Sequence, residues 1–270
     1  MSDDEATSEF ERATAVERRG ETNVWSAEIH DGWDIFGNAN GGYLLALAAR
    51  AMGDAVGRPP VTITCQYLRP GTPGPCTIEV DVVRAGRRFA TVSATLVGSS
   101  GDRVVTLLGT FGDQDPGGPS LDTFFEPFEL PTYDECVARP ATAETPAMMA
   151  KLDARFHPAD VGYGDGRPSG RPEMRGWFAF ADGGPIDAYG LLLAADAFAP
   201  PIFNTDLPVA WVPTVELTVH VRAVPEPGPL RGRFRSILVQ DGLLDEEGVL
   251  LDITGRIVAQ ARQLALVPRG

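Results

Sequence analysis

The chain of 270 residues has no run of eighteen consecutive apolar residues, and Ser2-Asp3-Asp4-Glu5 near its start is acidic. The first absence argues against a membrane-spanning helix, and the second argues against a secretory signal. With 23 basic and 37 acidic residues, a net charge of −14, the chain lacks the basic surplus that nucleic acid or an anionic membrane attracts. We therefore expect a cytoplasmic protein that binds neither nucleic acid nor membrane.

Cysteine and histidine are scarce, with three of each. Cys65, Cys76 and Cys136 are odd in number and lack CxxC spacing, so we expect reduced, partly buried thiols and no structural zinc. The histidines lack a metal-ligand spacing such as HExxH, and the chain has no GxSxG elbow, P-loop lysine or GxGxxG spacing. These absences disfavour metal, serine-triad and nucleotide chemistry, and no cofactor is expected.

What the chain does contain is an internal repeat. Residues 43–52, YLLALAARAM, resemble residues 189–198, YGLLLAADAF, at an offset of 146 residues. Further along, Gly74-Pro75 matches Gly228-Pro229, and residues 101–105 match residues 255–259, both at an offset of 154 residues. A period of about 150 residues is too long for a solenoid, and it favours two fused α+β domains.

Each copy predicts one strand, one helix and four further strands, in that order. The first copy has a strand at 22–29, a helix from Gly41-Gly42 to about Ala55, and strands at 61–68, 77–83, 89–97 and 103–111. The second has strands at 174–181, 215–221, 230–240, 243–252 and 256–267 around a helix at Tyr189. Residues 112–171 are rich in Pro, Gly and acidic residues, with a short helical candidate at 147–156.

The pattern predicts an α+β double hotdog, in which two fused units each wrap an antiparallel sheet around a long helix. Two such sheets can join edge to edge, which removes exposed strand edges. The predicted boundaries are 1–111 for the N-terminal hotdog unit, 112–171 for a linker, and 172–270 for the C-terminal unit with the candidate active site.

Two residues break the apolar pattern of the second copy. Asp196 follows Tyr189, Leu192 and Leu193 at i, i+3, i+4 and i+7, so it lies on the core face of its helix, where a charge is costly unless paired or used. Gln263 lies in the strand row 257, 259, 261, 263, 265 and 267, whose other members are apolar and mostly small. A buried amide needs hydrogen-bond partners, and Asp196 could be one of them.

Three further features are weaker. Thr214 opens the strand after Pro213, but by parity it shares a face with Glu216 and Thr218 rather than with the apolar row. Basic residues are densest around the turn at residue 86, which could bind a phosphorylated substrate or could be a solvated edge. That candidate substrate-binding set is Arg84, Arg87 and Arg88.

The chain resembles the acyl-CoA thioesterase II type of double-hotdog thioesterases. The resemblance is carried by Gly41-Gly42, by residues 67–71 (YLRPG) and 83–89 (VRAGRRF), and in the second copy by Ala195-Asp196, residues 213–215 and residues 255–263. In that family an Asp, a Thr or Ser and a Gln jointly hold the attacking water. By position, the resemblance implies that these residues are Asp196, Thr214 and Gln263.

The resemblance implies direct hydrolysis of a fatty or related acyl-CoA, without a covalent intermediate, a metal or a cofactor, in a role related to lipid metabolism. Asp196 would act as general base or orient the water, Gln263 and Thr214 would fix its direction, and backbone amides would polarise the thioester carbonyl. Thr218 could replace Thr214 if the register is shifted. A homodimer or higher homo-oligomer is expected, because hotdog sheets commonly pair.

Alternatives remain open at this point. Residues 34–40 (DIFGNAN) resemble the signature of single-hotdog thioesterases, with Asn38 in place of its His, so Asp34 is a second candidate site. A hotdog enoyl-CoA hydratase would need an Asp and His pair, for which His30 and Asp34 are the candidates. A non-catalytic acyl- or CoA-binding module is the third hypothesis.

Overall fold

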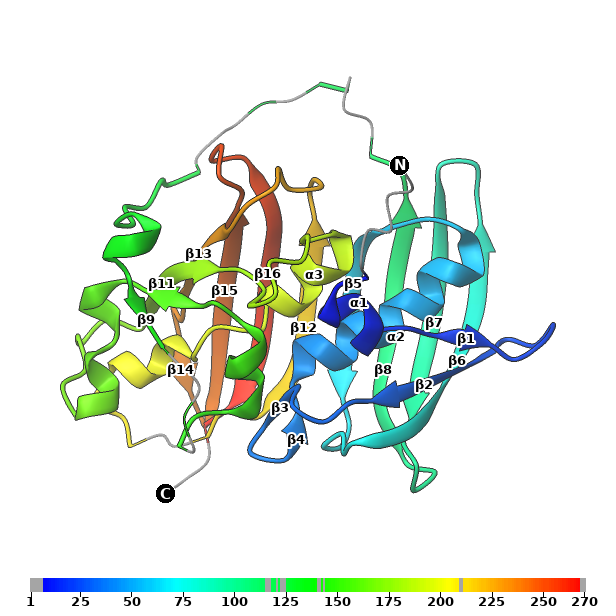
Figure 1. Ribbon diagram of the computed structural model, residues 1–270, viewed down its shortest axis with the longest axis horizontal. Coiled ribbons are helices and arrows are strands. Elements are labelled where there is room, and N and C mark those ends of the chain that lie inside the picture. The colour runs from blue at the N-terminus through cyan, green and yellow to red at the C-terminus, as the bar shows by residue number, and fades with distance from the viewer. Residues whose placement is uncertain are drawn as a thin grey trace.

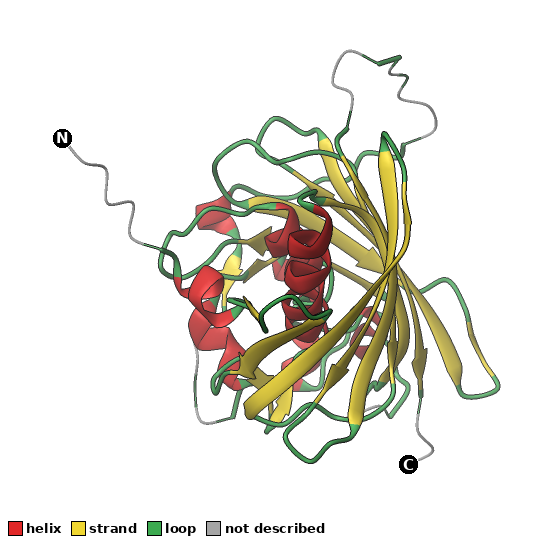
Figure 2. Cartoon of the chain, turned by 90° about the vertical axis from the view of Figure 1, so that its right-hand side faces the viewer, coloured by secondary structure: helices red, strands yellow, loops and turns green. Residues whose placement is uncertain are grey.

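The structure is a computed structural model, and it describes residues 7–114, 118–119, 121, 125–139, 142, 144–208 and 211–267. One fourteen-stranded sheet extends through both halves of the molecule, and a separate two-stranded hairpin lies beside it. Figure 2 shows that this sheet curves around the helices, which lie on its concave side. The predicted α+β double hotdog is confirmed.

The first unit is built around α2 (Gly41–Val56), and α1 (Glu9–Ala13) precedes it. The Asn40 side chain caps α2 by accepting from the Tyr43 amide at 2.9 Å, and Gly57, with φ 62°, ends it in the left-handed conformation. Residues 42–49 are all buried, as expected for a helix that is apolar on all sides. The strands of this unit are β1 (Glu17–Arg18), β2 (Val24–Ile29), β5 (Pro60–Tyr67), β6 (Gly74–Ala85), β7 (Phe89–Val97) and β8 (Arg103–Gly112), and the separate hairpin is β3 (Asp34–Ile35) with β4 (Asn38–Ala39).

The second unit is built around the shorter helix α3 (Ala188–Ala194). Asp187 caps this helix by accepting from the Tyr189 and Gly190 amides at 3.0 and 2.7 Å. The predicted strand 230–240 is two strands, β13 (Leu230–Arg235) and β14 (Val239–Gln240). The other strands are β11 (Glu173–Phe178), β12 (Thr214–Val221), β15 (Leu243–Leu251) and β16 (Ile257–Leu266).

The two halves of the sheet join where β5 pairs antiparallel with β12, with Cys65 opposite Leu217 and Ile63 opposite Val219. This pairing satisfies the backbone groups of two strands that would otherwise be sheet edges. The order across the whole sheet is β1-β2-β6-β7-β8-β5-β12-β16-β15-β13-β11-β10-β9, with β14 beside β15. The edge-to-edge junction therefore brings α2 and α3 together on the concave side.

The segment predicted as a linker contributes to the second sheet. Within it, β9 (Val137–Ala138) pairs with β10 (Arg155–Phe156), and β10 pairs with β11. The helical candidate at 147–156 is a 3-10 helix, η2 (Ala147–Lys151), followed by β10. The other 3-10 helices are η1 (Tyr133–Glu135), η3 (Pro158–Asp160), η4 (Gly162–Asp165) and η5 (Pro201–Asn204).

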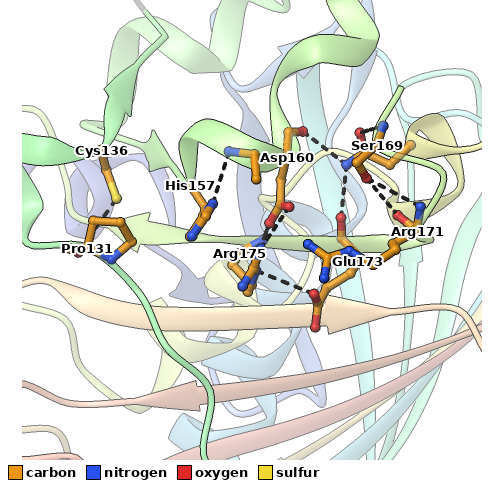
Figure 3. A network of polar contacts seen from close by, with 10 residues as sticks. Pro131, Cys136, His157, Asp160, Ser169, Arg171, Glu173 and Arg175 are labelled. Carbon is orange, nitrogen blue, oxygen red and sulfur yellow. Dashed lines mark hydrogen bonds and ion pairs between the residues drawn. The ribbon is translucent and has the colours of Figure 1, made fainter. Parts of the chain in front are cut away.

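A buried polar network fixes this segment to the sheet (Figure 3). Asp160, only 1% exposed, binds the Arg175 guanidinium through both oxygens, at 2.9 Å to Nε and 3.0 Å to a terminal nitrogen. The Asn204 side chain donates to the backbone carbonyls of Asp160 and Glu173, both at 2.9 Å. The ion pair and the amide together tie η3 and η5 to β11.

Two smaller expectations can also be compared with the structure. The thiols of Cys65, Cys76 and Cys136 are free, as expected, and all three are buried. Within the described residues, no helix is both long and apolar enough to cross a membrane.

Candidate active site

Asp196 lies in the turn after α3, and its carboxylate reaches the N-terminus of α2 in the other unit. Oδ2 accepts from the Gly42 amide at 2.8 Å and from the Asn40 side-chain amide at 3.0 Å. The Asn40 amide also donates to the Asp196 carbonyl at 3.0 Å. Because the partial positive charge of a helix is at its N-terminus, α2 stabilises the carboxylate that the end of α3 alone would disfavour.

The two glycines that begin α2 make this approach possible. A Cβ atom on Gly42 would lie 2.8 Å from the Leu193 carbonyl oxygen and 2.9 Å from Asp196 Cβ. On Gly41 it would lie 2.9 Å from Asp196 Oδ2 and 2.9 Å from Cε1 of Tyr67. The start of α2, the end of α3 and the Tyr67 ring therefore fit together only if both positions lack a side chain.

The ionisation of Asp196 reflects two opposing influences. Burial raises its pKa and the hydrogen bonds from the α2 terminus lower it, and the net result is a pKa of about 6. Oδ1 has no hydrogen-bond partner among the residues that the structure describes, and the side chain as a whole is half-buried. Asp196 is thus a largely ionised carboxylate near neutral pH, with one oxygen anchored and the other free to accept a proton.

The equivalent position of the first copy is Arg50, and it makes the mirrored contact. Its guanidinium bonds to Asp187, the N-cap of α3, at 3.0 Å and lies over the Tyr189 ring at 4.3 Å. Helices α2 and α3 therefore run antiparallel. Arg50, near the end of α2, contacts the N-terminus of α3, and Asp196, just after α3, contacts the N-terminus of α2. The first copy closes its contact with an ion pair, whereas the second copy leaves a carboxylate oxygen free.

Gln263 lies on the inner face of β16, as its row of small residues predicts. It is 6% exposed, and Leu217 of β12 and Glu246 of β15 lie opposite it on the two neighbouring strands. Its side chain makes no hydrogen bond to Oε2 of Glu246, which is buried without a partner among the described residues. Its amide is therefore available to a ligand on the concave side.

Thr214 also faces inward, contrary to the parity argument. A register irregularity between Thr214 and Glu216 adds one residue to β12, so Thr214 pairs with Ala265, whereas Leu217 pairs with Gln263. Directly opposed residues share a face, so Thr214 lies on the inner face, diagonal to Gln263. Thr218 faces outward, away from Gln263, and its hydroxyl bonds to that of Thr64 at 2.8 Å.

A fourth polar residue of this region was missed by the sequence reasoning. Glu246 is 8% exposed and lies opposite Gln263, and its Oε2 is buried without a partner among the described residues. Burial, together with the nearby charges of Asp196 and Asp245, raises its pKa to about 8. The sequence could have indicated it, because Leu244, Glu246 and Leu250 lie on the same face of β15, so that Glu246 is a polar residue in an otherwise apolar row.

The structure does not bring the arginine set of the first unit to Asp196. Arg84 lies in β6, and Arg87 and Arg88 lie in the turn after it. Arg58, just beyond the C-terminal end of α2, donates to the Gly86 carbonyl of this turn at 2.9 Å. Because α2 has sixteen residues, its two ends are about 24 Å apart, and Asp196 lies at the other end.

The alternative site in the first copy has a structural explanation. The Asp34 carboxylate accepts from the Gly37 amide at 2.8 Å and from the Gly32 amide at 3.2 Å, so it stabilises its own turn. The His30 backbone amide donates to the Tyr43 hydroxyl at 3.1 Å. The hydrogen bonds of Asp34 thus give no support to a catalytic His30–Asp34 pair.

A surface pocket of about 540 Å³ lies elsewhere in the second unit. It does not include Asp196, Thr214 or Gln263; its lining residues are Phe128, Glu129, Leu130, Pro131, His157 and Arg231. The described residues contain no group of three or more His, Cys, Asp or Glu side chains arranged to hold a metal ion. The polar residues on the concave side therefore remain the best candidate for chemistry.

Comparison with known proteins agrees with this architecture. A family model described as the acyl-CoA thioesterase N-terminal domain matches residues 29–112, and one described as the acyl-CoA thioesterase C-terminal domain matches residues 133–267. The second match begins inside the segment predicted as a linker, in agreement with the place of β9 and β10 in the sheet.

Individual relatives span nearly the whole chain. The crystal structure of a proposed thioesterase II from Thermobifida fusca YX is 33% identical, with a TM-score of 0.89 over 98% of this chain and 99% of that chain. An uncharacterised protein of Mycobacterium tuberculosis H37Rv is 29% identical over 91% of both chains. The fold of an acyl-CoA thioesterase II from Mycobacterium marinum, 16% identical, is similar over 97% of this chain and 98% of that chain, with a TM-score of 0.73.

Fold and family matches together define a thioester hydrolase of the double-hotdog class. The chain belongs to the acyl-CoA thioesterase family.

Proposed function

We propose that this chain hydrolyses an acyl-CoA to the free acid and CoA by direct attack of a water molecule. The observation that carries the proposal is the Asp196 carboxylate, with Oδ2 anchored at the α2 terminus and Oδ1 free. A pKa of about 6 leaves it mostly ionised at neutral pH, yet basic enough to accept a proton. The family to which the chain belongs supports an acyl-CoA as substrate.

In the proposed reaction, water bound between Asp196, Thr214 and Gln263 attacks the thioester carbon while Asp196 Oδ1 accepts one of its protons. The carbon–sulfur bond then breaks, and the departing CoA sulfur takes the proton from Asp196. The products are a carboxylic acid and a thiol, and the carboxylate is regenerated. Thr214 and Gln263 support this scheme because they are diagonal neighbours on the inner face of adjacent strands.

The test is release of free thiol, measured with dithionitrobenzoate across a series of acyl-CoA chain lengths. We expect Asp196→Asn to lose about a hundredfold or more in kcat/KM, because the amide cannot accept the proton. Thr214→Ala and Gln263→Leu should each lose about tenfold or more, since each removes one hydrogen bond to the water.

Matched controls lie on the same two strands but face outward. Thr218→Ala on β12 and Gln260→Ala on β16 change the same residue types away from the concave side, and they should keep wild-type rates. Wild-type turnover in Asp196→Asn, with intact folding, would exclude the site. Loss of enoyl absorbance without thiol release would instead indicate a hydratase, and binding of acyl-CoA without turnover would indicate a binding module.

A further inference from the structure

Glu246 and Gln263 form a buried polar pair on adjacent strands. They are directly opposed in the β15–β16 ladder, so their side chains share the inner face with Cβ atoms about 5 Å apart. They are 8% and 6% exposed. Two buried polar side chains at this separation can reach each other, and burial makes an unsatisfied group costly.

Among the described residues, no cationic group acts on Glu246, and neither the Ser236 hydroxyl nor the Gln263 amide forms a hydrogen bond to its Oε2. The charged groups that act on it are both carboxylates, Asp196 from the end of α3 and Asp245 from its own strand. Ser236, the next residue after β13 in register, is uncharged, and so is Gln263 on β16. Oε2 of Glu246 accepts no hydrogen bond from the described residues. Burial accordingly raises the pKa of this side chain to about 8.

We propose that Glu246 is a positioning residue of the hydrolysis: it is protonated in the working enzyme and donates a hydrogen bond to the amide oxygen of Gln263. The NH₂ group of Gln263 is thereby directed toward the attacking water. This inference rests on the proposed function of the same site, and it assigns to Glu246 a role through Gln263 rather than contact with substrate.

In this arrangement each proton and each lone pair of the attacking water has a partner. A water molecule has two protons and two lone pairs, and one lone pair must point at the thioester carbon. One proton goes to Asp196 Oδ1 and the other to the Thr214 hydroxyl oxygen, while the remaining lone pair accepts from the Gln263 NH₂ group. An ionised Glu246 would instead accept from that NH₂ group and turn the amide oxygen toward the water, leaving this lone pair without its donor.

Electrostatics favour the same protonation state. Attack on the thioester develops negative charge on the carbonyl oxygen, beside the Asp196 carboxylate that receives the proton. A second buried anion at Glu246 would raise the energy of that transition state, whereas a neutral acid does not. The protonated carboxyl group therefore both orients Gln263 and keeps the local charge low.

The first measurement needs no substrate. Infrared difference spectra of the free enzyme, recorded between pH 6 and pH 10, should show a protonated carboxyl signal that disappears near pH 8. The signal should be absent from Glu246→Gln and present in Asp196→Asn, where it titrates at lower pH because the neighbouring charge is gone. The absence of a carboxyl signal that titrates near pH 8, or its survival in Glu246→Gln, would overturn the inference, whereas the Asp196 carboxyl gives a separate signal that titrates near pH 6.

The second measurement is the pH profile of kcat/KM for acyl-CoA hydrolysis. The wild-type rate should fall on the alkaline side with an apparent pKa near 8, as Glu246 ionises. Glu246→Gln, whose NH₂ group still donates to Gln263, should stay within about threefold of the wild type at pH 7 and lose this alkaline fall. Glu246→Leu should lose about tenfold at pH 7, the equivalent of one hydrogen bond.

Glu247→Gln is the matched control, because Glu247 is the next residue on the same strand, faces outward and lies 3.5 Å from Arg235. It should keep the wild-type rate and profile. An alkaline fall that persists unchanged in Glu246→Gln would overturn the positioning role. A wild type that hydrolyses no acyl-CoA would overturn the proposed function and this role together, whereas an active wild type with an ionised Glu246 would overturn this inference alone.

Discussion

At the residue scale, the two oxygens of Asp196 have different surroundings. Oδ2 is held by the Gly42 amide and the Asn40 side chain, which fix the direction of the carboxylate, and Oδ1 remains free for a proton. The same hydrogen bonds oppose the effect of burial on the Asp196 pKa. The position of the carboxylate and its basicity therefore depend on the same donors.

Asn40→Ala tests this dependence. Removing the side-chain amide takes away a donor that stabilises the Asp196 carboxylate, so the pKa of Asp196 should rise above about 6. We expect the acid side of the kcat/KM profile, where the rate falls as Asp196 is protonated, to move to higher pH. The measurement is the pH dependence of thiol release between pH 5 and pH 8.

Asn40 also caps α2, so a second variant separates the two roles. Asn40→Ala should lose about 1 kcal/mol of stability with the cap, whereas Asn40→Ser keeps a capping oxygen but no amide for Asp196. In both variants the acid side of the kcat/KM profile should move to higher pH, but only Asn40→Ala should be less stable than the wild type. An acid side that stays in place in both would show that Asn40 does not set the basicity of Asp196.

At the scale of elements, the closest approach of α2 to α3 depends on a residue without a side chain. A Cβ on Gly42 would lie 2.8 Å from the Leu193 carbonyl oxygen, and backbone cannot rotate away as a side chain can. Gly42→Ala should therefore push the helices apart and destabilise the protein by about 1–3 kcal/mol. Thiol release should fall by about a hundredfold, because a displacement of about 1 Å misplaces the carboxylate.

The matched control is Gly190→Ala in α3. There a Cβ would lie 3.1 Å from Ile186 Cγ2, the end of a side chain that can move, and alanine improves helix propensity. Chemical denaturation should place Gly190→Ala within about 1 kcal/mol of the wild type, with unchanged activity. Equal behaviour of the two variants would contradict the importance of the close approach at Gly42.

The polar network around Asp160 gives a second test at this scale. Asp160→Ala would take the bidentate partner from the largely buried Arg175 guanidinium and leave only Glu173, 3.4 Å from Nε, so the loss should be somewhat below the about 3–5 kcal/mol of a fully unpaired buried charge. We expect a correspondingly lower free energy of unfolding, and early proteolysis of the segment that contains η3. Asp165→Ala, which removes an exposed ion pair with Arg167, should change stability by less than about 1 kcal/mol. Equal losses in both variants would contradict this assignment.

Periodicity predicted most of the elements because hotdog strands alternate cleanly and α2 has both a cap and an apolar interior. Periodicity placed Thr214 on the wrong face of the sheet, because β12 contains one extra residue between Thr214 and Glu216. Residues before such an insertion point to the opposite face from the one that simple alternation predicts, and nothing in residues 213–217 indicates the insertion. Glu246 lay within reach of the same alternation argument that found Gln263. The helix partner of Asp196 could not be predicted, because it depends on how α2 and α3 cross.

At the scale of the whole molecule, the duplication has produced two related helix contacts with different outcomes. Arg50 and Asp187 neutralise each other at the α3 terminus, and the guanidinium also lies over the Tyr189 ring. Asp196 meets only amide donors at the α2 terminus and retains its charge. We infer that the first contact stabilises the pair of helices, and that the second leaves a carboxylate for chemistry at a cost in stability.

That cost has a defined pH dependence. The folded state raises the pKa of Asp196 to about 6 and that of Glu246 to about 8, so it binds both protons more tightly than the unfolded chain. The contribution of these groups to stability is complete below their ordinary pKa values, at about pH 4. It is lost as the pH rises through the folded-state values, between about pH 4 and pH 8.

The double variant Asp196→Asn, Glu246→Gln replaces both groups with neutral side chains of the same shape. Its free energy of unfolding should be close to that of the wild type at pH 4 and higher by several kcal/mol at pH 9, because only the wild type must then bury the charges. Groups with lowered pKa values, such as Asp182 and Asp252, are common to both proteins and cancel in the difference. Urea denaturation at pH 4, 7 and 9 measures this difference in the free energy of unfolding, with Glu247→Gln as control. A difference that does not change with pH would mean that the two carboxyl groups ionise in the folded protein as freely as in the unfolded chain, and that the concave side is wetter than its burial indicates.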